Sequence, residues 1–297
     1  MKKSPYYKKR ALRGFLFISP WLIGFLVFQL YPFIASLFYS FTDYNLRMMH
    51  FVGLANYTQI FTNDPDFNKS LWVTMAYVLM TLPMKLIFSL FIALLVNNKI
   101  RGVGIYRTVY YLPSILGGSV TVALLWQFLF ERQGIVNTLM AKFGIPFVDW
   151  MGDPHISLFT LSLLSVWQFG SSMVLFLAGL KQIPVELYEA GRVDGASRSR
   201  MFFNITLPML SPIIFFNLVI QLIGTFQEFT AAYVVTQGGP IKSTYVYALF
   251  LYDQAFKFYK MGYASALSWV FFIIIMAITA LLFKSSSLWT FYEDGGK

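Results

Sequence analysis

Residues 189–208, EAGRVDGASRSRMFFNITLP, form a polar, glycine-containing stretch between two long apolar segments. Just before it, Pro184 is suited to the first turn of a helix, because the N–H that proline lacks has no partner there. Glu186 and Glu189 then lie on one face of that helix, and their charge complements the positive end of its dipole. Gly195 predicts the end of the helix, since glycine readily adopts the left-handed backbone conformation common at that position.

The composition shows what surrounds this stretch. The chain is 57% hydrophobic and 12% charged, with a mean hydropathy of +0.62, whereas soluble domains carry about 25% charged residues. A membrane-spanning helix needs roughly 20 apolar residues, and six blocks have that length: 15–41, 71–96, 105–130, 156–180, 207–235 and 263–283. We therefore predict an all-α integral membrane protein with six transmembrane helices. They form one domain, residues 15–284, between a basic tail, 1–14, and a second tail, 285–297.

The fifth block differs from the others because polar residues and a glycine interrupt its second half. The interruptions are Gln221, Gly224, Gln227 and Glu228, and they predict a broken or bent end. Before the block, we expect a second short helix at residues 196–205 that runs into Leu207-Pro208. Together with the helix that precedes Gly195, it is predicted to form a helix–turn–helix along the membrane surface.

Lys and Arg are distributed unequally between the two sides of the predicted membrane domain. Most of the 23 lie in the two tails and near residues 99–107 and 181–200. Because Lys and Arg are enriched in cytoplasmic loops, both termini and the connection at 182–208 are predicted to be cytoplasmic. Anionic lipid headgroups account for the net charge of +10. No connection is long enough to present the basic face of a nucleic-acid-binding domain, so we expect no nucleic-acid partner.

Several kinds of chemical site are excluded by residue types alone. The chain has no cysteine and only two histidines, His50 and His155, which rules out a disulfide, a thiolate nucleophile and a Cys/His zinc site. It also lacks a Walker A sequence and a Rossmann glycine fingerprint. We therefore expect no catalytic residues, no metal and no bound cofactor in this chain.

The polar stretch resembles the cytoplasmic coupling loop, or EAA loop, of membrane subunits of ATP-binding-cassette (ABC) importers. The agreement runs from Glu189 through Asp194-Gly195-Ala196 to Ile205-x-Leu207-Pro208. Gly191 departs from the family, which usually has Ala there, and costs up to ~1 kcal/mol of helix propensity. The resemblance implies a helix that inserts into a cleft on an ATPase subunit, with Glu189 as the salt-bridging acid and Gly195 as the turn. It assigns ATPase coupling to Glu186, Glu189, Ala190, Gly191, Asp194, Gly195 and Ala196.

Three other segments resemble the carbohydrate branch of these permeases, which includes maltose permeases. They are Gly53-Leu54-x-Asn56-Tyr57, Arg107-Thr108-x-Tyr110-Tyr111-Leu112-Pro113, and Thr236-Gln237-Gly238-Gly239-Pro240 followed by Ser243-Thr244. The resemblance implies a type I importer core and an outer loop in which Gly238, Gly239 and Pro240 face a substrate-binding protein. From the residues alone, the same Gly-Gly-Pro is equally explained as a simple turn.

The resemblance also implies partners that this chain does not supply. They are a second homologous permease subunit, two ATPase subunits that hold ATP and Mg, an extracytoplasmic solute-binding protein, and a sugar or oligosaccharide, in a bacterial cytoplasmic membrane. The alternatives are a permease for another small solute, such as a polyamine or phosphate, or a stand-alone secondary transporter. A membrane enzyme is a third alternative, but no acid pair or histidine cluster lies in mid-span to support it.

Polar residues in the third to fifth blocks are the candidates for a substrate pathway, because polar groups in a membrane usually face a cavity or the bundle interior. The predicted pathway residues are Ser114, Gly118, Ser165, Trp167, Gln168, Ser172, Gln221 and Gln227. For Gly117, Gly118 and Ser119 the favoured alternative is close packing of helices, which small residues allow.

Two charged residues in the apolar blocks need a separate explanation. Lys85 lies in mid-span just after Pro83, and Glu228 lies near the end of the fifth block. One hypothesis is an ion pair between them. The alternatives are that Lys85 lines a water-filled route or extends its amine to the membrane surface.

Overall fold

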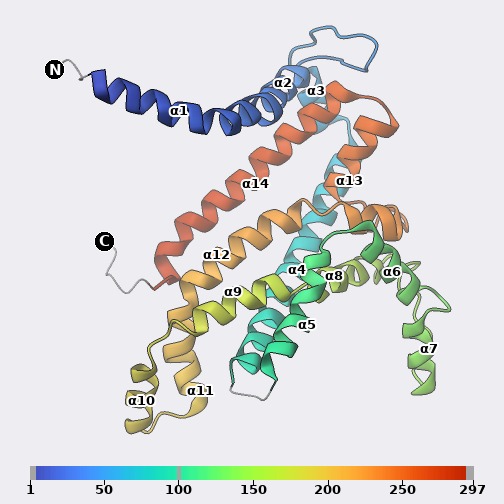
Figure 1. Ribbon diagram of the computed structural model, residues 1–297. Helices are drawn as coiled ribbons and strands as arrows, with labels where there is room; N and C mark the ends of the chain where they lie inside the picture. The colour runs from blue at the N-terminus through green and yellow to red at the C-terminus, as the bar shows by residue number, and fades with distance from the viewer. Residues whose placement is uncertain (1–4, 99–101, 292–297) are drawn as a thin grey trace. The chain divides into compact units, whose positions relative to one another are not determined.

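The computed structural model describes residues 5–98 and 102–291, and this part of the chain is built from helices, with one isolated bridge between Thr42 and Phe51 (Figure 1). The π-helical segments are labelled η. The elements are α1 (Pro5–Phe25), η1 (Leu26–Leu30), α2 (Tyr31–Ser40), α3 (Ala55–Thr62), α4 (Pro65–Asn97), α5 (Val103–Leu116), α6 (Val120–Phe130), α7 (Ile135–Lys142), α8 (Ser157–Trp167), α9 (Gly170–Leu180), α10 (Val185–Val193), α11 (Arg198–Met201), η2 (Phe202–Thr206), α12 (Leu207–Phe226), η3 (Ala232–Thr236), α13 (Tyr247–Tyr252), η4 (Asp253–Lys257) and α14 (Met261–Trp289).

Within the described residues, four helical stretches are long and apolar enough to cross a membrane. They are Gly14–Ser40, Pro65–Asn97, Arg198–Phe226 and Met261–Trp289. Two bent pairs bring the number to six if each is one span: α5 with the stretch Val120–Lys142, bent by 105°, and α8 with α9, bent by 47°. The all-α membrane fold predicted from the six apolar blocks is confirmed.

Two of the predicted spans are nevertheless not continuous helices. The third, residues 105–130, is interrupted between α5 and α6, and the fourth, residues 156–180, between α8 and α9. The break predicted in the fifth block is confirmed, because α12 ends at Phe226. The short helix predicted at residues 196–205 is present as α11 and η2, and it continues into α12 as one helical stretch, Arg198–Phe226.

The chain divides into two compact units, and the first consists of Met1–Asp64 with Leu251–Phe272. Inside it, the ring of Phe33 on α2 packs 4.7 Å from that of Trp269 on α14, and the Trp269 indole donates to Ser36 Oγ at 3.2 Å. Gly262 lies so close to the chain just after α2 that an added Cβ would collide with the carbonyl oxygen of Thr42. These contacts join the start of α14 to α2.

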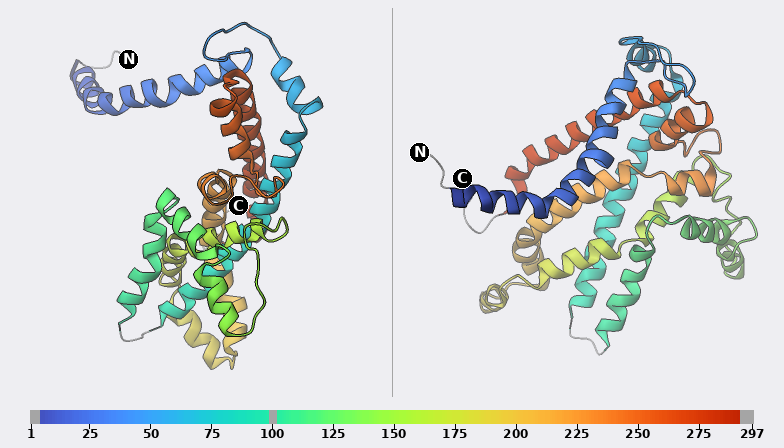
Figure 2. Two further views of the ribbon diagram at one scale, coloured as in Figure 1. Left: turned by 90° about the vertical axis from the view of Figure 1, so that its right-hand side faces the viewer. Right: turned by 45° about the horizontal axis from the view of Figure 1, so that its top comes forward.

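The second unit, Pro65–Phe250 with Ile273–Lys297, is centred on α4, which packs against α8, α9 and α12. Its core is an apolar cluster drawn from these helices: Ile92, Ala93, Val96, Phe169, Met173, Phe176, Leu177, Leu180, Ile183 and Leu210. Buried polar groups also join its helices, for example Thr81 on α4, which donates to Ser162 on α8 at 2.8 Å. Figures 1 and 2 show α10 and α11 side by side at one end of this unit.

Two of the π-helical segments share a cause that the sequence carries. Segment η1 is followed two residues later by Pro32, and η2 is followed two residues later by Pro208. Proline has no N–H to donate, and its ring clashes with the carbonyl four residues earlier. In both segments the residue before proline instead donates across five residues, Tyr31 to Leu26 and Leu207 to Phe202. The wider turn thus accommodates proline without ending the helix.

Candidate functional site

The break between α5 and α6 is formed by glycine and serine. Gly117 has a φ of +53°, which favours glycine. Ser119 is extended and caps α6 by accepting a hydrogen bond from the Val122 N–H at 3.3 Å. A Cβ added at Gly117 or Gly118 would meet no atom of another helix within 4 Å. The packing role favoured for these glycines is therefore wrong, because they break the helix instead.

The break between α8 and α9 lies against this first break. The side-chain amide of Gln168 donates to the Gly117 carbonyl at 3.1 Å. In return, Ser114 on α5 donates to the Gln168 carbonyl at 3.1 Å and accepts from the Ser171 N–H at 3.0 Å. Backbone groups that leave a helix inside a membrane need such partners, because no water replaces them.

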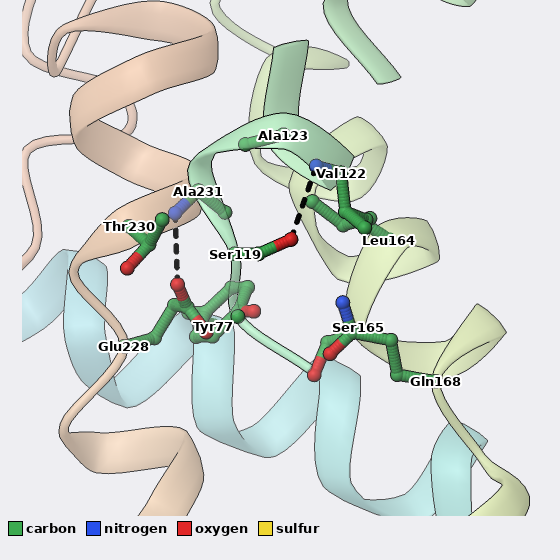
Figure 3. Close-up of a pocket in the computed structure, with 11 residues that line it drawn as sticks. Tyr77, Ser119, Val122, Ala123, Leu164, Ser165, Gln168, Glu228, Thr230 and Ala231 are labelled. Carbon is green, nitrogen blue, oxygen red and sulfur yellow. Dashed lines mark hydrogen bonds between the residues drawn. The ribbon is translucent and has the colours of Figure 1, made fainter. Parts of the chain in front are cut away.

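A small polar pocket lies beside the two breaks (Figure 3). Its lining combines one carboxylate, one phenol, hydroxyls and an amide with apolar side chains. The lining residues are Tyr77, Gly118, Ser119, Val122, Ala123, Leu164, Ser165, Gln168, Glu228, Thr230 and Ala231. Polar groups on membrane-spanning helices usually face a cavity or the interior of the bundle, as these do.

Three of the predicted pathway residues lie on this pocket, namely Gly118, Ser165 and Gln168. The other five do not line it: Ser114, Trp167, Ser172, Gln221 and Gln227. Ser114 is used in the contact between the two breaks, and the Trp167 ring packs 6.0 Å from that of Trp126. Ser172 is fully buried, and its carbonyl accepts from Asn217 at 3.2 Å. The role of these residues in transport stays a prediction.

The sequence analysis missed Tyr77 and Thr230 as members of the pocket. Tyr77 lies on α4 and is only 1% exposed. A tyrosine hydroxyl in the middle of an apolar block was the available signal. Glu228 was identified as a membrane charge, and here one of its carboxylate oxygens accepts from the Ala231 N–H at 2.9 Å.

The predicted ion pair between Lys85 and Glu228 is not formed among the described residues. Lys85 is nevertheless buried, with a relative exposure of 8%. Lys85 therefore does not extend its amine to the membrane surface. The two side chains remain separate charges within one unit.

The polar stretch forms α10, which presents two different faces. Glu186, Glu189 and Ala190 are exposed, whereas Tyr188 and Gly191 are half-buried. A Cβ added at Gly191 would lie 3.3 Å from the end of the Ile205 side chain. The inner face of α10 therefore packs against η2, which leads into the base of α12, and its acidic face is exposed.

The end of α10 follows the Schellman pattern. Gly195 has a φ of +73°, which confirms the predicted left-handed glycine. Its N–H donates to the Arg192 carbonyl at 3.0 Å, and the Ala196 N–H donates to the Gly191 carbonyl at 2.8 Å. These are the two bonds of the Schellman motif. Asp194, at the C-cap, is exposed.

The Gly-Gly-Pro turn is also shaped by glycine. Gly238 has a φ of +81°, and a Cβ there would meet the Tyr245 ring at 2.7 Å. The peptide bond between Gly239 and Pro240 is cis, and the Gly239 N–H donates to the Thr236 carbonyl at 2.9 Å. The turn therefore requires Gly238 for its own fold. Its predicted contact with a binding protein is not tested by this geometry.

Apolar helices broken around a polar pocket, with an exposed acidic helix at one end of the bundle, define a membrane permease. The chain belongs to the family described as binding-protein-dependent transport system inner membrane component, whose sequence model matches residues 69–288. This confirms the resemblance to ABC importer permeases. Membership of a binding-protein-dependent system also sets aside the stand-alone transporter and the membrane enzyme.

Two curated relatives and one solved structure support this assignment. The chain is 51% identical to the probable ABC transporter permease protein YesP of Bacillus subtilis, over 99% of this chain and 96% of the relative. It is 34% identical to the arabinooligosaccharides transport system permease protein AraP of the same organism, over 95% and 90%. Its fold matches a chain of a bacterial alginate ABC transporter, crystallised with an alginate pentasaccharide-bound periplasmic protein. That match has a TM-score of 0.82 at 22% identity and covers 94% of this chain and 95% of the other.

Proposed function

We propose that this chain is one membrane subunit of an ATP-driven importer for sugars or oligosaccharides. The observation that carries the substrate class is the 34% identity, over 95% of the chain, to a permease for arabinooligosaccharides. The pocket supports it, because its Glu228 carboxylate, Gln168 amide and Ser165 hydroxyl suit the hydroxyl groups of a sugar. Among the importer permeases, a polyamine or phosphate carrier has no comparable support.

The proposed complex contains a second homologous permease and two ATPase subunits that hold ATP and Mg. A binding protein delivers the sugar from outside and docks near Gly238, Gly239 and Pro240. The exposed acids Glu186 and Glu189 on α10 suit insertion into an ATPase cleft. In this proposal α10 and both termini lie on the cytoplasmic side of a bacterial membrane, which the distribution of Lys and Arg supports.

The proposed mechanism is alternating access. ATP-driven closure of the two ATPases draws together α10 of this chain and the equivalent helix of the second permease. The spanning helices then open the pathway outward, and hydrolysis returns it inward. ATP chemistry belongs to the partner subunits, while this chain binds, orients and releases the sugar.

The test is reconstitution of this chain with its partner permease, ATPase and binding protein in lipid vesicles. ATP-dependent uptake is measured for arabinotriose, maltotriose and an alginate trisaccharide, with putrescine and phosphate as non-sugar probes. Glu189→Ala is expected to lower ATP-driven uptake at least about tenfold, the effect of losing one charge-assisted contact. Gly195→Asp is expected to lower it as well, because a φ of +73° is unfavourable for a residue with a Cβ. Arg198→Ala, at an exposed site on α11, is the matched surface control.

Either of two results would overturn the proposal. One is uptake of a sugar by the purified chain alone, indifferent to ATP. The other is wild-type uptake by both the Glu189 and the Gly195 variants. Uptake confined to putrescine or phosphate would retain the importer and contradict the sugar.

A further inference from the structure

The base of α12 is tied to α10 by one pair of hydroxyl groups. The phenol of Tyr188 on α10 lies 2.9 Å from Oγ1 of Thr206, the last residue of η2. Thr206 is 5% exposed, and its Oγ1 also lies 3.5 Å from the Met201 carbonyl oxygen, toward which it donates. With that proton directed at Met201, Tyr188 donates to Thr206.

This contact lies in the part of the helical stretch Arg198–Phe226 where regular α-helical hydrogen bonds are missing. Pro208 and Pro212 each lack an N–H, and η2 replaces α-helical bonds with the wider five-residue pattern. Both features concentrate bending in a helix, and π-helical segments are frequent at functional positions. The base of α12 is therefore the place where this helix can change direction, and Tyr188 is bonded to it.

The other contacts of Tyr188 give it a fixed position. Its ring packs against the apolar cluster of α4, α9 and α12, as does Ile205. Gly191, one turn further along α10, leaves room for Ile205 and Met201. The inner face of α10 thus contacts η2 through apolar groups, whose contacts are not directional, and through the Tyr188–Thr206 hydrogen bond, which is directional.

We infer that Tyr188 is a positioning residue that transmits movement of α10 to the base of α12 through its hydrogen bond with Thr206. The inference rests on the proposed function, because it requires an ATPase that moves α10. It assigns to Tyr188 a role separate from docking. The exposed acids of α10 contact the ATPase, and the buried phenol passes the movement to the spanning helix.

The experiment uses the complete complex and needs no knowledge of the sugar. Because the chain has no cysteine, Thr230→Cys places a single thiol in this chain on the pocket, beyond the far end of α12. Its rate of alkylation by a membrane-impermeant maleimide is measured without nucleotide and with ATP plus vanadate. ATP hydrolysis is measured on the same sample.

With Tyr188 present, ATP and vanadate are expected to change the alkylation rate. Tyr188→Phe, which keeps the ring and removes only the hydroxyl, is expected to reduce that change about threefold to tenfold, the equilibrium effect of one hydrogen bond. ATP hydrolysis is expected to remain close to the wild-type rate, because the Tyr188 phenol faces η2 rather than the exposed acidic face of α10. Thr206→Val is expected to reduce the response by the same amount, whereas Thr206→Ser, which keeps the hydroxyl, is expected to respond like wild type. The double variant Tyr188→Phe with Thr206→Val is expected to be no worse than either single variant.

The outcomes separate the two proposals. If ATP does not change the alkylation rate even with Tyr188 present, the coupling proposed for α10 fails. If the rate responds to ATP and Tyr188→Phe leaves the response unchanged, only the role of Tyr188 is overturned. Loss of hydrolysis together with the response in Tyr188→Phe and Thr206→Val, while Thr206→Ser behaves like wild type, would show that the bond serves folding rather than transmission.

Discussion

The side-chain amide of Gln168 donates to the carbonyl oxygen of Gly117 at 3.1 Å and so fastens the break in one helix to the break in another. Fifty-one residues separate the two in sequence. In a membrane, a carbonyl released from its helix finds no water, so the protein must supply the donor. The two breaks therefore depend on each other, and the pocket depends on both.

Replacing Gln168 by Leu removes this donor, while the Gly117 carbonyl keeps the bond from the Ser119 N–H at 2.8 Å. We expect the free energy of unfolding of the purified complex to fall by about 0.5–1.5 kcal/mol, the net value of one hydrogen bond, measured by thermal denaturation. Gln227→Leu changes an exposed side chain at the end of α12 and is expected to stay within about 0.5 kcal/mol. Equal midpoints for the two variants would contradict a structural role for the bond.

Gly170 is the position with the least room between α5 and α9. An added Cβ would lie 2.5 Å from the Tyr110 carbonyl oxygen and 2.7 Å from the Tyr111 Cα, and backbone atoms cannot move aside cheaply. Gly170→Ala should therefore cost about 1–3 kcal/mol, as overpacking does. The control is Gly224→Ala on α12, where no atom lies within 4 Å. A neutral Gly170→Ala in the same thermal assay would show that α5 can move away from α9.

The two glycines of α10 should respond in opposite ways to alanine. At Gly191 the new methyl group meets only the tips of Ile205 and Met201, so Gly191→Ala should be neutral or gain up to ~1 kcal/mol of helix stability. At Gly195 the φ of +73° makes alanine cost roughly 1–2 kcal/mol. Thermal denaturation and ATP-dependent uptake of both variants test the difference, and the reverse order would contradict the cap geometry.

Lys85 and Glu228 should behave as separate charges. Since no ion pair joins them, Lys85→Met should not incur the loss of about 3–5 kcal/mol that follows when one partner of a buried pair is removed. A double-mutant cycle with Glu228→Gln, followed by thermal denaturation, should give a coupling energy below about 1 kcal/mol. A larger coupling would show that the two side chains meet directly in the complex.

Local features of the molecule could be predicted from short stretches of sequence. The left-handed Gly195 and the two acids on one face of α10 follow from neighbouring residues alone. The break after Phe226 could also be predicted, because Gln227 and Glu228 interrupt an apolar run. In each case the residues that cause the structure lie within a few positions of it.

The pocket could be predicted only in part, because its walls come from distant segments. The run around Gly117 and Gly118 is apolar on both sides, so it indicated a continuous packed helix. The break is stabilised in part by Gln168, which lies on another span. Tyr77 likewise becomes a pocket residue through the packing of α4 against α8, which no pattern within α4 reveals.

The π-helical segment η2 also has a geometric consequence. Each residue of an α-helix advances the chain by about 100° around the axis, so the one residue that a wide turn adds shifts the angular phase of everything before it. Deleting one residue from Phe202–Thr206 would restore the α-helical count and rotate Arg198–Met201, with α10 attached, by about 100° around α12. Because Thr206 contacts Tyr188 on α10, the direction in which Glu189 points depends in part on the residue count in η2. An altered count there would turn the acidic face that we propose for ATPase docking.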